Sequence, residues 1–97
     1  MAQITKEGNR WLVNGAMSMP HVDALLAESA SLEATKDIEI DLSAVSDVDT
    51  ATISLLFEWL RQAHSRKCKV TYANLPENLA SLATLYGVLE LIPQVSH

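Results

Sequence analysis

The residues best suited to chemistry in this sequence lie in one stretch, Asp41 to Ile53, which reads DLSAVSDVDTATI. The pattern before it ends like a strand, and Asp49 or Thr50 can cap a helix after it. The amide end of that helix would face a small surface depression ringed by four hydroxyl residues, Ser43, Ser46, Thr50 and Thr52. These hydroxyls can receive a phosphate, cap a backbone donor or bind a partner. An ordinary N-cap among loop hydroxyls is the alternative, and the spacing leaves both open.

Metal and enzyme chemistry find little support in the sequence. Asp41, Asp47 and Asp49 cluster, but they lack the Gly and distal Glu of a calcium loop, so we interpret them as loop acids and a helix cap. The three histidines are far apart, and the single Cys68 excludes a cysteine-built zinc site. No nucleophile elbow and no phosphate-binding glycine loop is present. We therefore expect no metal, no cofactor and no catalytic activity.

The elements that position this stretch follow from hydrophobic periodicity and turn residues. A hairpin is predicted over 2–6 and 10–14, because Gly8 and Asn9 suit its turn. Helices are predicted over 20–32, from Asp49 or Thr50 to 67, and over 76–87, with strands over 37–42 and 69–74 and a last strand or turn over 88–92. This order predicts an α/β fold, a mixed sheet of four to five strands with three or four helices mainly on one face.

The long helix carries two apolar stripes. The first is predicted to face the core and consists of Ile53, Leu56, Phe57, Leu60 and Ala63. The second begins at the helix N-terminus with the apolar residues Ala51, Leu55 and Trp59 and is continued by the polar residues Gln62 and Arg66. Because Trp and Arg are enriched at interface hot spots, the second stripe is a candidate partner surface. The alternative is that Trp59 caps the edge of the core.

Length, charge and hydropathy restrict the class of protein further. Ninety-seven residues make a single domain, 1–97. The net charge of −5 argues against nucleic-acid binding, which needs a basic face. No apolar run approaches the ~18–20 residues that span a bilayer, and no secretory signal begins the chain. We therefore expect a cytoplasmic protein without direct membrane insertion.

The stretch and the element order together resemble the STAS domain family. The similarity rests on Asp41-Leu42-Ser43, on Val45 and on Val48-Asp49-Thr50 before a long helix, and it extends over almost the whole chain. Within the family, the chain is similar to the small STAS subunit of Mla phospholipid-transport ABC complexes, which also carries Val-Asp-Thr at this helix start. A second segment similar to that branch is Leu82-Ala83-Thr84-Leu85-Tyr86-Gly87-Val88.

The sequence departs from the anti-sigma-factor antagonists of the same family at two positions. Their phosphate-accepting hydroxyl corresponds to Ala51, which has no oxygen, and their following Gly corresponds to Thr52. A phosphate switch would therefore need Thr50 or Thr52. This difference favours the transporter branch.

The resemblance implies a non-catalytic STAS subunit of an ABC transporter that maintains outer-membrane lipid asymmetry. Its partner would be the ATPase subunit, in a complex with a permease at the inner face of the inner membrane, and Thr50 would be a regulatory residue. The predicted partner-binding residues are Ser46, Asp47, Asp49, Thr50, Ala51, Thr52, Leu55, Trp59, Gln62 and Arg66. The alternative is an anti-sigma-factor antagonist that binds a serine-kinase anti-sigma factor through the same surface, and a nucleotide-binding STAS protein is a more distant one.

Overall fold

The computed structural model describes residues 3–30 and 37–94 and contains one mixed sheet. Its strands are β1 (Gln3–Glu7), β2 (Arg10–Gly15), β3 (Ile38–Val45) and β4 (Val70–Ala73). Their order in the sheet is the order in the chain, with β1 antiparallel to β2 and both other pairs parallel. The predicted hairpin is confirmed, and Gly8 occupies its turn at φ 60°. The sheet therefore presents the carboxyl ends of its three parallel strands at one edge.

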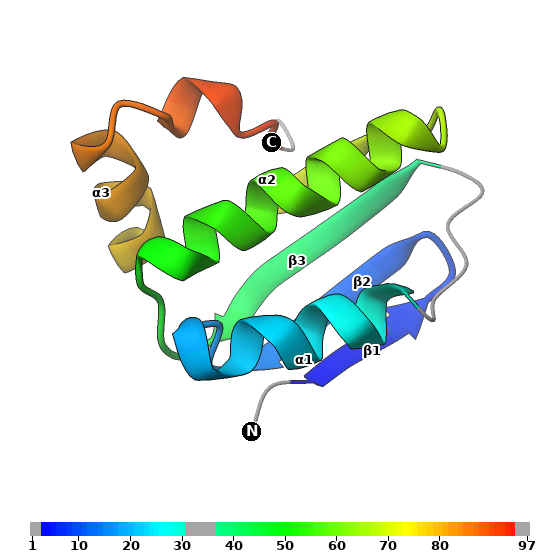
Figure 1. Ribbon diagram of the computed structural model, residues 1–97, viewed down its shortest axis with the longest axis horizontal. Coiled ribbons are helices and arrows are strands. Elements are labelled where there is room, and N and C mark those ends of the chain that lie inside the picture. The colour runs from blue at the N-terminus through cyan, green and yellow to red at the C-terminus, as the bar shows by residue number, and fades with distance from the viewer. Residues whose placement is uncertain (1–2, 31–36, 95–97) are drawn as a thin grey trace.

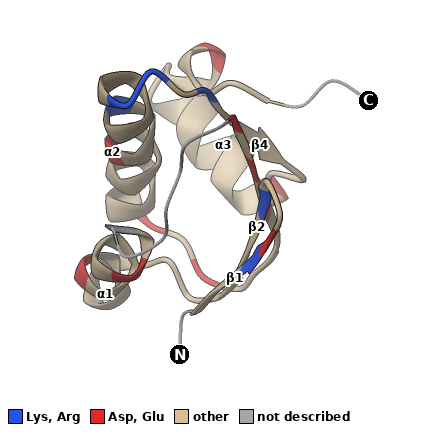
Figure 2. Ribbon diagram, turned by 90° about the vertical axis from the view of Figure 1, so that its right-hand side faces the viewer, with Lys and Arg blue, Asp and Glu red and all other residues tan. Residues whose placement is uncertain are grey.

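Helices connect the parallel strands. The helices are α1 (Met19–Ala30), α2 (Thr50–Ser65) and α3 (Glu77–Leu85), followed by the short 3₁₀ helix η1 (Leu89–Leu91). Helices α1 and α2 lie side by side on one face of the sheet, and α3 lies beside the N-terminal half of α2 (Figures 1 and 2). The predicted α/β class and mixed sheet are thus confirmed. The prediction of a strand or turn over 88–92 is resolved as η1, and Gln94 forms only an isolated bridge with Tyr72.

The sheet has one covered face and one open face, as its alternating burial shows. Trp11 and Val13 in β2 point toward the helices, as do the buried residues Ile38, Ile40, Leu42, Val70 and Tyr72 in β3 and β4. Arg10, Glu39 and Thr71 are paired across the opposite face, on which none of the described helices packs (Figure 2). Burial of one face only is the arrangement that alternating strands encode.

Helix α2 is rotated relative to the prediction. Leu56 is fully buried, but Leu55 and Trp59 are buried as well, at 1% and 3% exposure. Phe57 and Leu60, predicted to face the core, are only partly buried. The physical reason is that α1 packs along α2, so the second apolar stripe is covered by the chain itself. The interpretation of Leu55 and Trp59 as an exposed partner surface is therefore wrong.

Trp59 shows how the two helices are joined. Its indole Nε1 donates to Ser29 Oγ at 2.9 Å, and that hydroxyl donates to the Leu26 carbonyl at 2.9 Å. Its ring meets Trp11 edge-on, with centroids 6.2 Å apart and an interplanar angle of 84°. Such pairs add stability beyond area burial. Trp59 is therefore a junction between α1, α2 and β2.

Among the helices of the described ranges, none is both long and apolar enough to cross a membrane.

Candidate functional site

The site is built where α2 begins, and Asp49 organises it. Asp49 is the N-cap, and its Oδ1 accepts the Ala51 N–H at 2.9 Å. Its second oxygen, Oδ2, accepts the Met19 N–H, the first amide of α1, also at 2.9 Å. One carboxylate therefore caps two helices that begin thirty-one residues apart, which fixes their N-termini side by side.

Thr52 completes this junction from the inside. Its hydroxyl accepts the Asp49 N–H at 3.0 Å, so the pair forms a capping box in which Thr52 takes the place of the usual Glu. The same hydroxyl donates to the Met17 carbonyl at 2.8 Å, and the side chain is fully buried. The prediction that Thr52 presents its hydroxyl at the surface is therefore wrong, because both hydrogen-bonding directions of that group are used inside the fold.

The loop before α2 is held against the end of β2 by backbone hydrogen bonds. Ser46 N–H donates to the Gly15 carbonyl at 2.9 Å, and Met17 N–H donates to the Asp47 carbonyl at 2.8 Å. The side chains of Ser46 and Asp47 are left exposed. These backbone bonds and the Asp49 cap hold the loop in place. The side chains of Ser46 and Asp47 are not needed for this and stay available to another molecule.

Thr50, the first residue of α2, is exposed and joined to α3. Its hydroxyl lies 3.1 Å from the hydroxyl of Tyr86, thirty-six residues later, and the two are hydrogen-bonded. Asp49 already supplies the cap, so helix formation does not need the Thr50 hydroxyl. The predicted placement of Thr50 at the surface beside the helix N-terminus is confirmed.

Exposed apolar side chains lie in the segments that meet at this point. Four large apolar residues within 3–30 and 37–94 stand out into solvent, and three of them belong to segments joined here: Met19 is 68% exposed, Leu85 is 78% exposed and Tyr86 is 53% exposed. We call Met19, Thr50 and Tyr86 with the neighbouring Leu85, Ser46 and Asp47 the α2 N-terminal surface. In Figure 1 the N-termini of α1 and α2 and the helix α3 lie at the same end of the molecule. Exposed apolar groups beside ordered polar groups mark interaction surfaces.

The remaining predicted site residues lie elsewhere. Ala51 follows Thr50 and is half-buried, whereas Gln62 lies in the last turn of α2 and Arg66 is the C-cap of that helix. The sixteen-residue helix is about 24 Å long at 1.5 Å per residue, so Arg66 lies at the far end from Thr50. The structure therefore brings Ser46, Asp47, Asp49, Thr50 and Ala51 together, and it separates Gln62 and Arg66 from them.

Sequence reasoning missed Met19 and Tyr86. Tyr86 follows Leu79, Leu82 and Ala83 at helical spacing, which predicts that it joins their apolar stripe on α3, but it is exposed and its hydroxyl is hydrogen-bonded to that of Thr50. The sequence does carry a signal for the exposure of Tyr86, which is its position just before Gly87. A glycine with positive φ, here 69°, is typical of the residue after a helix C-cap, so Tyr86 lies at the end of α3 and not within its packed stripe.

Asp41 belongs to the open face of the sheet and not to the α2 N-terminal surface. Burial raises the pKa of its carboxyl, but hydrogen bonds from Ser43 and Asn74 and the charge of Arg10 outweigh it, and the net pKa lies below the ordinary value. Arg10 pairs with both Asp41 and Glu39. Over residues 3–30 and 37–94, no three His, Cys, Asp or Glu side chains are grouped to hold a metal ion; His97 lies outside these ranges.

Comparison with known proteins identifies one matching family and several solved structures with the same fold. The family model described as "Mlab, STAS domain" matches residues 2–93. No curated protein sequence matches the chain.

Solved structures with the same fold include the anti-sigma factor antagonist SpoIIAA in its unphosphorylated form, with a TM-score of 0.74 at 12% identity over 100% of this chain and 90% of that one. RsbS from Moorella thermoacetica has a TM-score of 0.63 at 20% identity, covering 99% and 86% of the two chains. An anti-sigma-factor antagonist STAS domain protein from Planctomyces limnophilus has a TM-score of 0.68 at 15% identity, covering 99% and 90%. At identities this low, the structural similarity establishes a shared fold and nothing more.

Proposed function

Because the chain belongs to the STAS domain family, we propose that it is a non-catalytic interaction subunit of an ABC transporter for phospholipids. Its partner is the ATPase subunit, bound within a complex that also holds a permease at the inner face of the inner membrane. In this role the chain stabilises the assembly and regulates ATP hydrolysis. The match to the Mla-type family model supports the transporter branch of the family.

The observation that carries the proposal is the α2 N-terminal surface. Met19, Leu85 and Tyr86 are largely exposed, and hydrogen bonds from Met19 to Asp49 and between Tyr86 and Thr50 join their segments to the start of α2. A partner that covers them gains hydrophobic stabilisation of about 25 cal/mol per Å² buried. The hydrogen-bonded Thr50 and Tyr86 hydroxyls supply a polar centre that fixes orientation.

Asp49 and Thr52 make this surface rigid before a partner arrives. The shared cap holds Met19 and Thr50 in fixed relative positions, and Thr52 anchors the start of α2 to Met17. A preorganised surface loses little conformational entropy on binding, so more of the contact energy appears as affinity.

Thr50→Glu tests the proposal directly. The isolated domain should fold normally, because a negative charge suits a helix N-terminus and the cap is supplied by Asp49. At a packed interface the new carboxylate would be buried without a partner, which costs several kcal/mol. We expect the variant to melt like the wild type, to fail to co-purify with the ATPase subunit and to lose transport-dependent outer-membrane integrity.

Ala27→Glu is the matched control, since it adds the same charge at an exposed position in the C-terminal half of α1. It should fold and bind like the wild type. If Thr50→Glu binds the ATPase as tightly as the control does, or if it melts well below the control, the role given to this surface is wrong.

The second candidate function is that of an anti-sigma-factor antagonist, and the similarity of fold to SpoIIAA favours it. In that case the same surface binds a serine-kinase anti-sigma factor. Ala51 offers no hydroxyl, and the buried Thr52 hydroxyl is engaged, so Thr50 is the hydroxyl exposed to a kinase at the start of α2. Incubation with the host's anti-sigma kinases and ATP, followed by intact-mass measurement, should leave the chain unmodified if the transporter proposal is right. A stoichiometric phosphate on Thr50 would favour the antagonist.

A further inference from the structure

A hollow lies beside the α2 N-terminal surface, where α3 ends and η1 begins. It is open to solvent, has a volume of about 230 Å³ and is lined by Thr84, Gly87, Leu89 and Glu90. These lining residues flank Leu85 and Tyr86 of the α2 N-terminal surface in the chain. Pockets for small molecules usually have volumes of roughly 300–1,000 Å³. This hollow is smaller, and its size suits a single side chain of a protein partner.

Apolar groups border the hollow along the chain. Leu85, which precedes the end of α3, and Leu91, which lies in η1, are 78% and 63% exposed. Leu89 lines the hollow itself and packs partly against the core. The stem of a lysine or arginine side chain packs well on such groups, because its methylene groups are apolar and only its end is charged.

Glu90 is the charged group of the hollow, and no cation of the described chain balances it. Its side chain is exposed and forms no hydrogen bond or salt bridge with any described residue. The same holds for the side chain of Asp47, in the loop before α2. Two unpaired carboxylates therefore belong to this end of the molecule, one before α2 and one after α3.

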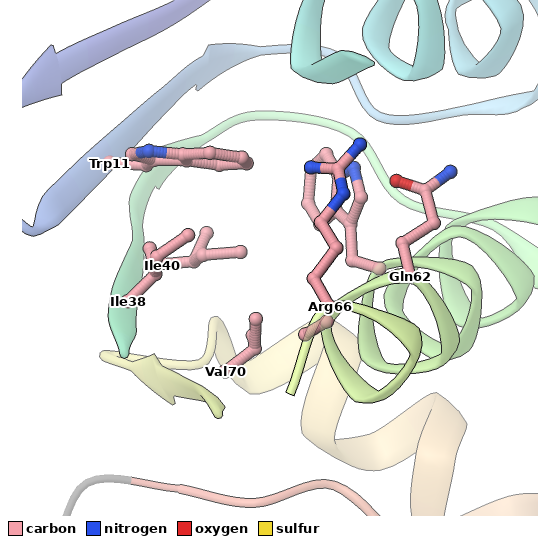
Figure 3. Close-up of a pocket in the computed structure, with 8 residues that line it drawn as sticks. Trp11, Ile38, Ile40, Gln62, Arg66 and Val70 are labelled. Atoms are coloured by element: carbon pink, nitrogen blue, oxygen red, sulfur yellow. The ribbon is translucent and has the colours of Figure 1, made fainter. Parts of the chain in front are cut away.

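The positive charges of the described residues lie at the opposite end of the molecule. They belong to the β1–β2 hairpin and to the segment from the last turns of α2 to the start of β4, and they are Lys6, Arg10, Arg61, Arg66, Lys67 and Lys69. Figure 2 shows them in blue on β1, on β2 and around the end of α2, with none on α1 or α3. Figure 3 shows Arg66 at this end, across from Trp11 of the sheet. A partner at the α2 N-terminal surface therefore meets unbalanced negative charge.

We propose that the hollow receives a basic side chain of the protein that covers the α2 N-terminal surface, with its apolar stem on Leu89 and its cation on Glu90. This rests on the proposed function, which takes that protein to be the ATPase subunit. The matching region of the partner carries a lysine or arginine next to apolar side chains that cover Leu85 and Tyr86. Complementary charges of this kind speed the encounter and fix the register of the two surfaces.

The kinetics of binding to the immobilised ATPase subunit test the proposal, measured by surface plasmon resonance at low and at high salt. Glu90→Gln should lower the association rate constant about three- to tenfold at low salt and reduce its dependence on salt, because it removes one steering charge. Glu90→Lys should lower it more than about tenfold, since two like charges then meet. Glu90→Asp keeps the charge and should retain most of the wild-type rate.

Glu7→Gln is the matched control, because it removes the same charge from an exposed position at the opposite end of the molecule. It should change the association rate constant by about twofold or less, because salt screens charges over such distances. Glu7 and Glu90 are both exposed, so all four variants should melt like the wild type.

The outcomes separate this proposal from the proposed function. If the wild type binds the ATPase subunit and Thr50→Glu does not, but Glu90→Gln and Glu90→Lys associate like Glu7→Gln, the seat for a basic side chain is wrong and the proposed function stands. If the wild type does not bind the ATPase subunit, the proposed function fails and this assignment of the partner fails with it.

A second copy of the chain is the other source of a basic side chain, and sedimentation of the isolated protein at low salt tests for it. The chain should remain a monomer over the concentrations used for binding. Self-association that Glu90→Lys abolishes would mean that the basic end of another copy occupies the hollow, and this result would also overturn the proposal.

Discussion

The carboxylate of Asp49 and the backbone amide of Met19 are joined by a hydrogen bond of 2.9 Å, which makes the cap of α2 also the cap of α1. The other oxygen of the same carboxylate holds the Ala51 amide. Two helix N-termini, each with free amides and a positive dipole end, therefore meet at one negative charge. Thr50 and Met19, the exposed residues on either side, owe their relative position to it.

Asp49→Ala should destabilise the domain by about 1–3 kcal/mol, because a typical cap contributes about 1 kcal/mol and this one serves two helices. Asp49→Asn keeps one side-chain acceptor and should cost roughly half as much. Urea unfolding of both variants beside Thr50→Ala checks this, since Thr50→Ala removes no cap and should cost less than about 1 kcal/mol. Equal losses in Asp49→Ala and Thr50→Ala would contradict the shared cap.

The rotation of α2 changes which leucine matters most for stability. Leu56 is fully buried, so Leu56→Ala should cost about 2–5 kcal/mol, close to the whole stability of a small domain. Leu60 is only partly buried, and Leu60→Ala should cost clearly less, about 1–2 kcal/mol. Chemical denaturation of the two variants gives the order directly. A larger loss for Leu60→Ala would mean that the helix faces the core in the orientation predicted from its sequence.

Asp41 should give the domain a measurable acid sensitivity. Its pKa is lowered in the folded state, so it contributes stability that is present above the unfolded value near 3.8 and is lost as the pH falls through the folded value. Asp41→Asn cannot ionise and lacks this contribution. The difference in unfolding free energy between wild type and Asp41→Asn should therefore be constant from pH 7 to about pH 5 and shrink below about pH 4. If this difference stayed constant down to pH 3, folding would not lower the pKa of Asp41.

Tyr72 joins the end of the sheet to the middle of α2. Its buried hydroxyl donates to the Leu56 carbonyl at 2.7 Å, and burial raises the pKa of that hydroxyl well above the ordinary value. Tyr72→Phe keeps the ring and removes this bond, so it should cost about 0.5–1.5 kcal/mol. Thermal melts at neutral pH measure the loss, with exposed Tyr86→Phe as the control that should leave the melting temperature nearly unchanged. A Tyr72→Phe variant as stable as the control would show that the bond contributes nothing net.

Several elements of this protein can be predicted from the sequence because the interactions that form them are local. Alternation over 37–42 predicted β3, and the Asp49 cap predicted the start of α2, since a strand period and a cap each depend on neighbouring residues. The resemblance to STAS domains was carried by the same short stretch, and the family match over residues 2–93 confirms it.

Tertiary structure decided what covers each surface. The sequence by itself determined that α2 has two apolar stripes, but an apolar stripe is equally satisfied by a helix of the same chain or by a partner. Only the packing of α1 showed that Leu55 and Trp59 are core residues, with the Trp59 indole bound to Ser29.

The exposed site was decided in the same way. Thr50 could be placed at a helix start from its neighbours, whereas its hydrogen bond to Tyr86 and the nearby Met19 join segments about thirty or more residues apart. Such contacts depend on how α1 and α3 dock against α2, and no local pattern encodes that geometry. The sequence therefore determined the elements and their order, and the long-range packing of those elements decided which side chains remain free to act.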